Sequence, residues 1–142
     1  MTQIKRNWKR NLSLGLILLI GIGITTERVV AYQISQITHP SRVISSSMQD
    51  GNGQPLKRVV LNTSDGLNLA AWYIPPRNGV AIIVQHGYRA NAQQMLPIGL
   101  MLARNSYGVL LFDFRAHGES LGDVVTLGLN EVKDTEAALN FL

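Results

Sequence analysis

The pattern of apolar and polar residues divides the chain into one long apolar run, a polar stretch and a series of short apolar segments. The first run, residues 12–26, contains no charged residue and is dominated by Leu and Ile. As a helix it would reach roughly 22 Å, which is short against a hydrocarbon core of about 30 Å. That length is typical of the apolar core of a secretory signal. A locally thinned bilayer would allow residues 11–32 to span it instead.

The short apolar segments of the second half predict strands and helices. Residues 58–63 and 67–74 flank Asp65-Gly66 and predict a β-hairpin, because glycine accepts the backbone conformation of the turn. Residues 80–84 and 109–112 are continuously apolar, which is typical of parallel strands covered on both faces. The order predicts an α/β fold, in which an antiparallel hairpin leads into parallel strands with crossover helices, preceded by the amino-terminal apolar helix.

Two amphipathic stretches predict the helices of this domain. Residues 95–104 carry a broad apolar surface, and Pro97 should lie in the first turn, so we expect that helix to begin near Gln94. A last helix should begin at Asn130, whose side chain is a good N-cap. Residues 33–55 are polar and predict a linker with one weak strand near Val43. The predicted divisions are therefore 1–31 as signal peptide or membrane anchor, 32–55 as linker and 56–142 as an α/β domain.

Charge changes the interpretation of the amino terminus. The chain has 13 Lys and Arg against 9 Asp and Glu, and four of the basic residues, Lys5, Arg6, Lys9 and Arg10, precede the apolar run. The rest of the chain is neutral, which argues against a nucleic-acid partner. Positive charges before an apolar run keep that end on the cytoplasmic side, so we expect a domain that is membrane-anchored outside the cytoplasm or secreted. A buried core helix is the alternative, which the four flanking cations disfavour.

Polar residues that could carry chemistry follow the two predicted parallel strands. The first segment, residues 85–91, has the sequence Gln-His-Gly-Tyr-Arg-Ala-Asn, and the second, residues 113–120, has the sequence Asp-Phe-Arg-Ala-His-Gly-Glu-Ser. Ligand sites in open α/β sheets lie beyond the carboxyl ends of such strands. The absence of cysteine excludes disulfides, Cys-ligated zinc and a thiol nucleophile.

In this order and spacing, the two segments resemble the amino-terminal half of α/β-hydrolases. The similarity is greatest to the serine aminopeptidase/monoglyceride-lipase-like group and covers about residues 56–142, including the last predicted helix. The resemblance implies a partial α/β-hydrolase fold. It also implies that the complete family hydrolyses ester, amide or peptide bonds of small-molecule or peptide substrates through an acyl-enzyme, without a cofactor.

The resemblance assigns roles to six residues. The backbone N–H of Tyr88 would stabilise the oxyanion, Gly87 would permit the tight turn, and His86 would support the loop through backbone hydrogen bonds. His86 is not expected to be the base, because in this family the base follows the nucleophile and acid in chain order. Charge-assisted bonds of Asp113, Arg115 and His117 would hold the second loop.

A metal site formed by His86, Asp113 and His117 is conceivable. It is disfavoured because neither segment has a local ligand spacing that is known to bind metal, so we expect neither a metal nor a cofactor.

Ser120 lies in Gly118-Glu-Ser-Leu-Gly122, which matches the Gly-x-Ser-x-Gly pattern of a nucleophile. We interpret it as a decoy, because a nucleophile elbow needs a sharp turn directly from strand into helix, whereas the apolar strand ends several residues earlier. On this interpretation the chain is a truncated serine hydrolase that carries the oxyanion loop and lacks the nucleophile, acid and base. The chain alone is then expected to be inactive.

The sequence leaves two other functional classes of protein to consider. A non-enzymatic, membrane-tethered α/β interaction protein remains an alternative. A nucleotide-binding domain is disfavoured, since the loop after residue 84 lacks a Gly-x-Gly-x-x-Gly cradle and no Walker lysine is present.

Overall fold

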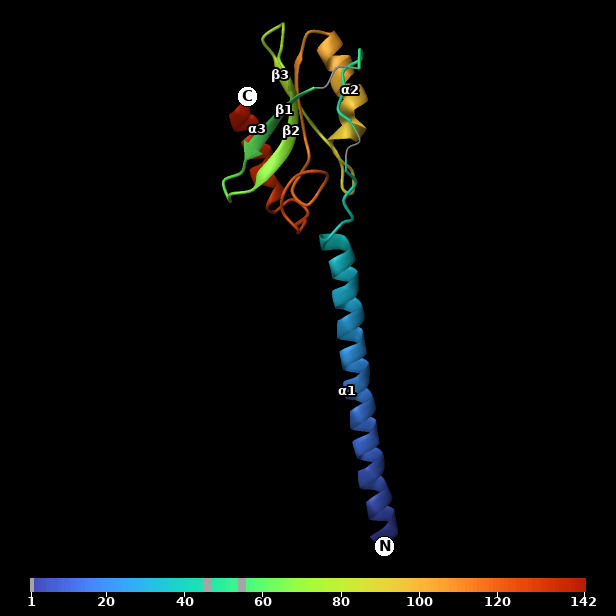
Figure 1. Ribbon diagram of the computed structural model, residues 1–142. Helices are drawn as coiled ribbons and strands as arrows, with labels where there is room; N and C mark the ends of the chain where they lie inside the picture. The colour runs from blue at the N-terminus through green and yellow to red at the C-terminus, as the bar shows by residue number, and fades with distance from the viewer. Residues whose placement is uncertain (1, 45–46, 54–55) are drawn as a thin grey trace. The chain divides into compact units, whose positions relative to one another are not determined.

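The computed structural model describes residues 2–44, 47–53 and 56–142 and divides the chain into two compact units, Met1–Ile37 and Thr38–Leu142 (Figure 1). Helix α1 (Thr2–Thr38) accounts for the first unit and is longer than the predicted span. Its stretch Arg10–Thr38 is long and apolar enough to cross a membrane, by length and composition alone. A signal sequence near the amino terminus would meet the same criterion, so both predicted interpretations stay open.

The second unit is built on a four-stranded sheet with the order β1-β2-β4-β3. Strands β1 (Lys57–Asn62) and β2 (Asn68–Ile74) form the predicted antiparallel hairpin. Strand β4 (Gly108–Phe112) pairs antiparallel with β2 and parallel with β3 (Ala81–Gln85). The predicted hairpin and parallel pair are therefore confirmed, and β4 lies inside the sheet with all five residues buried.

Alternate residues of the sheet contribute to two hydrophobic clusters, one on each face. Val109 and Leu111 of β4 pack with Trp72 against helix α2 (Ala92–Arg104). Leu110 and Phe112 belong to the opposite cluster, which includes residues of helix α3 (Glu131–Phe141). Figure 1 shows α2 and α3 on opposite sides of the sheet. A central strand covered on both faces is why this segment of the sequence is apolar without alternation.

The predicted start of α2 needs correction, whereas α3 begins at Glu131 with Asn130 as its N-cap residue, as predicted. Helix α2 begins at Ala92, not near Gln94, because the Asn91 side chain accepts the Gln94 N–H at 3.3 Å and caps it; Pro97 therefore lies in the second turn. The side chain of Asn130 makes no capping bond to α3. Its Oδ1 instead accepts a hydrogen bond from the Lys133 ammonium at 3.0 Å.

Part of the predicted linker packs against the α/β domain. Residues 41–44 form no strand, so the weak strand expected near Val43 is wrong. Met48 belongs to the core cluster on the α2 face, and the Val43 carbonyl accepts the Asn91 Nδ2–H at 2.8 Å. The guanidinium of Arg42 donates to the carbonyls of Ser120 and Gly122. Residues 45, 46, 54 and 55 of the predicted linker lie outside the described residues.

Candidate functional site

The candidate site lies at the carboxyl ends of β3 and β4, where two loops meet because the strands are parallel neighbours. The β3 loop comprises residues 86–91 and the β4 loop residues 113–120. Two histidines connect them in opposite directions. His86 Nε2 accepts the N–H of Phe114 at 3.0 Å, and His117 Nε2 accepts the N–H of Arg89 at 3.1 Å. We call this pair of contacts the two-histidine bridge.

The hydrogen-bond partners of both rings assign one tautomer. The Nδ1 atom of His86 lies 2.7 Å from the Gly87 carbonyl oxygen, and that of His117 lies 2.9 Å from the Arg115 carbonyl oxygen. A carbonyl can only accept, so Nδ1 carries the proton and Nε2 is the acceptor in each ring. Burial lowers the pKa of His86 and favours this neutral form. All four ring nitrogens therefore have protein partners, and neither ring is arranged as a general base.

The residues predicted to form the oxyanion loop line a cavity of about 150 Å³. Tyr88 is 45% exposed, its ring lies edge-on to His117 with 6.0 Å between ring centroids, and the guanidinium carbon of Arg89 lies 5.4 Å above it. The remaining walls are mostly apolar. The full lining is His86, Gly87, Tyr88, Phe114, His117, Val125, Leu127 and Glu131. The oxyanion role of the Tyr88 N–H stays a prediction.

Asp113 joins the β4 loop to the start of α2. Its carboxylate is fully buried and accepts the N–H of Ala92 at 2.6 Å and the N–H of Glu119 at 2.8 Å. The first contact places a negative charge at the positive end of a helix. Gly118 has φ +45°, and a Cβ there would lie 2.0 Å from the carboxylate oxygen Oδ2 of Asp113. Only glycine therefore fits at this position.

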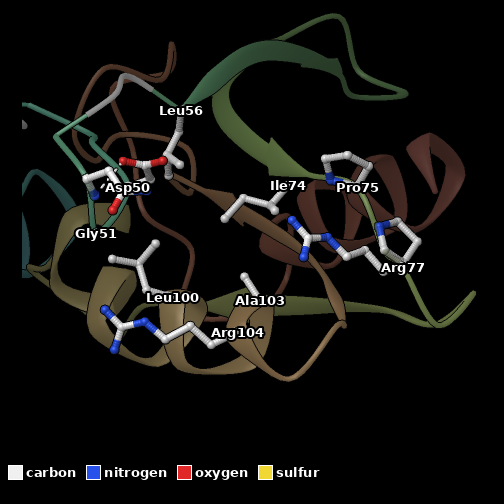
Figure 2. A pocket seen from close by; sticks show the side chains of 11 residues that line it. Asp50, Gly51, Leu56, Ile74, Pro75, Arg77, Leu100, Ala103 and Arg104 are labelled. Atoms are coloured by element: carbon white, nitrogen blue, oxygen red, sulfur yellow. Dashed lines mark hydrogen bonds between the residues drawn. The ribbon is translucent and has the colours of Figure 1, made fainter.

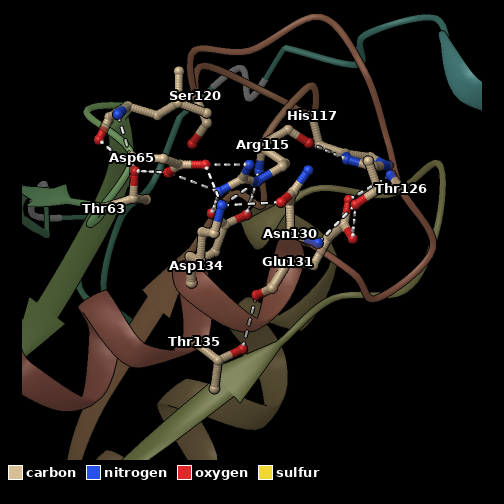
Figure 3. A network of polar contacts seen from close by, with 12 residues as sticks. Thr63, Asp65, Arg115, His117, Ser120, Thr126, Asn130, Glu131, Asp134 and Thr135 are labelled. Atoms are coloured by element: carbon tan, nitrogen blue, oxygen red, sulfur yellow. Dashed lines mark hydrogen bonds and ion pairs between the residues drawn. The ribbon is translucent and has the colours of Figure 1, made fainter.

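Arg115 is the buried centre of an ion network that Figure 3 shows between the turn joining β1 to β2, the β4 loop and α3. Its guanidinium contacts Asp134 at 2.7 Å and Asp65 at 2.9 Å, and its backbone N–H donates to Asp134 at 3.0 Å. Burial opposes the charge of Arg115, but the hydrogen bonds to the two carboxylates raise its pKa. The hydrogen bond from Arg115 lowers the pKa of Asp65 in turn.

Glu131 organises the segment that forms the outer wall of the cavity. Its carboxylate accepts the N–H of Thr126 at 2.8 Å, the N–H of Gly128 at 2.7 Å and the hydroxyl of Thr126 at 2.8 Å. Burial opposes its charge, but these hydrogen bonds lower the pKa of Glu131. The partners of Glu131 lie only three to five residues earlier in the sequence. Asp134 instead meets Arg115, 19 residues away on the β4 loop, so a local pattern gives no signal for that contact.

Ser120 is fully buried, and both of its hydrogen-bonding functions are occupied. Its Oγ accepts the N–H of Ala70 at 2.9 Å and donates to the carbonyl of Asp113. The serine lies several residues after β4 and before the segment that leads to α3, not on a strand-to-helix turn. This hydroxyl ties the β4 loop to β2 and is not presented to a substrate.

A larger cavity of about 680 Å³ lies at the other end of the parallel strands (Figure 2). It is lined by the end of β2, the end of α2 and the turn at Asp50, and Arg77 and Arg104 contribute guanidinium groups. None of the lining residues is a serine or a histidine. Within the part of the chain that the structure describes, no group of three His, Cys, Asp or Glu residues could hold a metal ion.

Comparison with known proteins identifies the fold of the α/β domain. No family model matches the chain. An esterase from Pyrococcus furiosus, Pf2001, superimposes with a TM-score of 0.65 at 34% identity, over 73% of this chain and 42% of the esterase. The fold is a partial α/β-hydrolase fold. The α/β hydrolase GrgF from Penicillium sp. sh18 also superimposes, with a TM-score of 0.52 at 26% identity, over 61% of this chain and 32% of GrgF.

Curated relatives match part of the chain. The uncharacterized protein YfhR of Escherichia coli K12 is 33% identical over 88 residues, which are 58% of this chain and 30% of YfhR. The chain thus spans less than a third of the length of this curated relative. These comparisons establish a hydrolase-type fold.

Proposed function

We propose that this chain belongs to a serine hydrolase of the serine aminopeptidase/monoglyceride-lipase-like group and supplies its oxyanion loop. The complete protein would cleave ester, amide or peptide bonds. The observation that carries the proposal is the β3 loop, which the two-histidine bridge holds against the β4 loop beside an apolar cavity. The similarity to an esterase at 34% identity supports the same class of reaction.

The proposed chemistry is acyl transfer. A serine hydroxyl attacks the substrate carbonyl carbon, and the resulting tetrahedral intermediate carries an oxyanion that backbone N–H groups stabilise. The intermediate collapses with cleavage of the ester or amide bond, and the leaving group takes up a proton; water then hydrolyses the acyl-enzyme. In this scheme the Tyr88 N–H is one oxyanion donor. Segments outside these 142 residues would supply the nucleophile, acid and base.

The same proposal includes a location for the domain. Helix α1 would act as a membrane anchor or a signal, with its four basic residues on the cytoplasmic side. Its length and hydropathy support either role. The α/β domain would then meet its substrates outside the cytoplasm.

Covalent labelling with a fluorophosphonate probe tests the proposal. The full 142-residue chain, purified in detergent, should remain unlabelled because Ser120 is buried and bonded. The protein extended by the continuation of its gene should be labelled at a serine beyond Leu142. Labelling that is lost on Ser120→Ala would contradict the assignment of Ser120, and the absence of a Gly-x-Ser-x-Gly in any downstream frame would remove the basis for the enzyme.

One observation favours the non-enzymatic alternative. Among the described residues, β3 has one strand neighbour, and α3 exposes Val132, Leu139 and Phe141. An interaction protein could use this edge to bind a partner or a second copy. Light scattering of the full chain in detergent separates the two cases, because a stoichiometric complex without any labelled serine would favour the interaction protein.

A further inference from the structure

The β3 loop contains a backbone conformation that needs support. Arg89 has φ +60°, in the left-handed region, which costs a non-glycine residue about 1–2 kcal/mol. A turn within the loop, from the Ala90 N–H to the Gly87 carbonyl at 3.2 Å, accompanies it. The contact from another element comes through the Arg89 N–H, which donates to His117. That N–H belongs to the peptide group between Tyr88 and Arg89, which adjoins the peptide that carries the Tyr88 N–H, so the contact fixes the chain immediately after the proposed oxyanion donor.

His117 can make this contact in one protonation state only. Its Nδ1–H is committed to the Arg115 carbonyl, so Nε2 must keep its lone pair to accept from Arg89. If Nε2 were protonated, two N–H groups would face each other. His117 is only 4% exposed, so water cannot easily replace the lost partner.

The surroundings of the ring contain few charges that could change this behaviour. The His86 ring lies 5.1 Å away, and its own Nδ1–H tautomer leaves it neutral. The Glu131 carboxylate lines the same cavity but is bound by two backbone N–H groups and a hydroxyl. The groups that face His117 are the aromatic ring of Tyr88, the backbone of Arg89, the carbonyl of Arg115, the imidazole of His86 and, across the cavity, the carboxylate of Glu131.

We propose that His117 is a positioning residue that sets the oxyanion loop when it is neutral and releases it when it is protonated. The neutral ring holds the left-handed backbone at Arg89 and the peptide group between Tyr88 and Arg89, next to the Tyr88 N–H. Acidification removes the acceptor and lets the loop relax. The oxyanion role of the β3 loop rests on the proposed function, whereas the two-histidine bridge can be tested without measuring catalysis.

Amide hydrogen exchange of the full chain in detergent tests the proposal. His117→Phe keeps an aromatic ring but removes the acceptor, and His117→Gln offers a side-chain oxygen in place of Nε2. One hydrogen bond contributes about 1 kcal/mol, so His117→Phe should accelerate exchange of the Arg89 amide roughly fivefold, and His117→Gln should restore much of the protection. The matched control is His39→Phe, which replaces the exposed third histidine and should leave the exchange of the Arg89 amide unchanged.

The Phe114 amide is the internal reference, because His86 holds it independently. If exchange at Phe114 and in β4 rises as much as at Arg89, His117 acts only through general stability and the proposal fails. Should His117→Phe not fold, the pH dependence of the unaltered chain decides. The protection of Arg89, corrected for intrinsic exchange, should fall at the midpoint at which the His117 ring titrates. Protection that is independent of that titration would overturn the proposal, and a failure of the enzymatic assignment would leave all of these results unchanged.

Discussion

Replacing Asp134 by alanine should destabilise the α/β domain more than any other single change to a charged residue of the Arg115 network. Asp134 is fully buried and accepts three donors of Arg115: the backbone N–H at 3.0 Å, Nε at 3.0 Å and Nη2 at 2.7 Å. Removal of one partner of a buried pair costs about 3–5 kcal/mol, since the other charge stays buried. Asp65 still contacts the guanidinium, so we expect the lower end of this range, about 3 kcal/mol.

Urea titration followed by tryptophan fluorescence measures this loss. The chain has two tryptophans, and Trp72 lies in the core, so a Trp8→Phe background isolates the signal of the α/β domain. With a slope of about 2 kcal/mol per molar urea, a loss of about 3 kcal/mol moves the midpoint down by roughly 1.5 M. Lys133→Ala removes an exposed ion pair to Asp65 at 3.2 Å and is the control, for which we expect less than about 1 kcal/mol.

A double variant tests the physical reason. Arg115→Met together with Asp134→Leu removes both buried charges, so it should be more stable than Asp134→Leu alone. A shift for Asp134→Ala no larger than that for Lys133→Ala would refute the reasoning. So would a double variant that is less stable than Asp134→Leu, because the penalty would then not come from an unpaired charge.

Three further predictions concern the loops around the cavity. Gly118→Ala should destabilise the domain by more than Gly128→Ala in urea titrations, because both glycines have a positive φ but only the first would place its Cβ against Asp113; equal losses would contradict this. Ser120→Ala should cost about 1–3 kcal/mol, since it leaves a buried N–H and carbonyl unpaired, and should leave fluorophosphonate labelling unchanged. The free energy of unfolding should fall as the pH drops below 6.5, the ordinary value for histidine, because the pKa of His86 is lowered in the folded chain and the unfolded chain binds the proton first. In His86→Gln this decline should be smaller, and an equal decline would assign it to other groups.

The sequence predicted the elements of the α/β domain well, since each signal is local. The continuous apolar run of β4 and the Asp65-Gly66 turn carry their information within a few residues. The start of α2 was missed by two residues because the penalty of Pro97 was weighed without the cap that Asn91 provides. The rule that places proline in the first turn of a helix was therefore outweighed by the hydrogen bond with which Asn91 caps α2.

For the candidate site, the sequence predicted the kind of bond that a residue makes but not its partner. Charge-assisted bonds were expected for Asp113 and Arg115, and such bonds are present. Their partners were not foreseeable, because Asp65 lies 50 residues from Arg115 in the sequence and meets it only when the turn after β1 and the β4 loop come together in the folded sheet. The packing of Met48 in the core was missed for the same reason, since a polar neighbourhood in the sequence does not reveal which single apolar side chain is buried.

The complete burial of β4 has a consequence for how accurately the sheet can assemble. Because both faces of the strand are apolar, a slip of one residue would still bury apolar side chains on each side, and hydrophobicity alone does not oppose it. The residues at the two ends of β4 oppose such a slip. A side chain at Gly108 would lie 2.7 Å from Pro76, and a slip in the other direction would carry the carboxylate of Asp113 into the place of Phe112. The alignment of the central strand therefore depends on one residue with no side chain and one with a charge, and errors in pairing during folding should be most frequent when either is replaced.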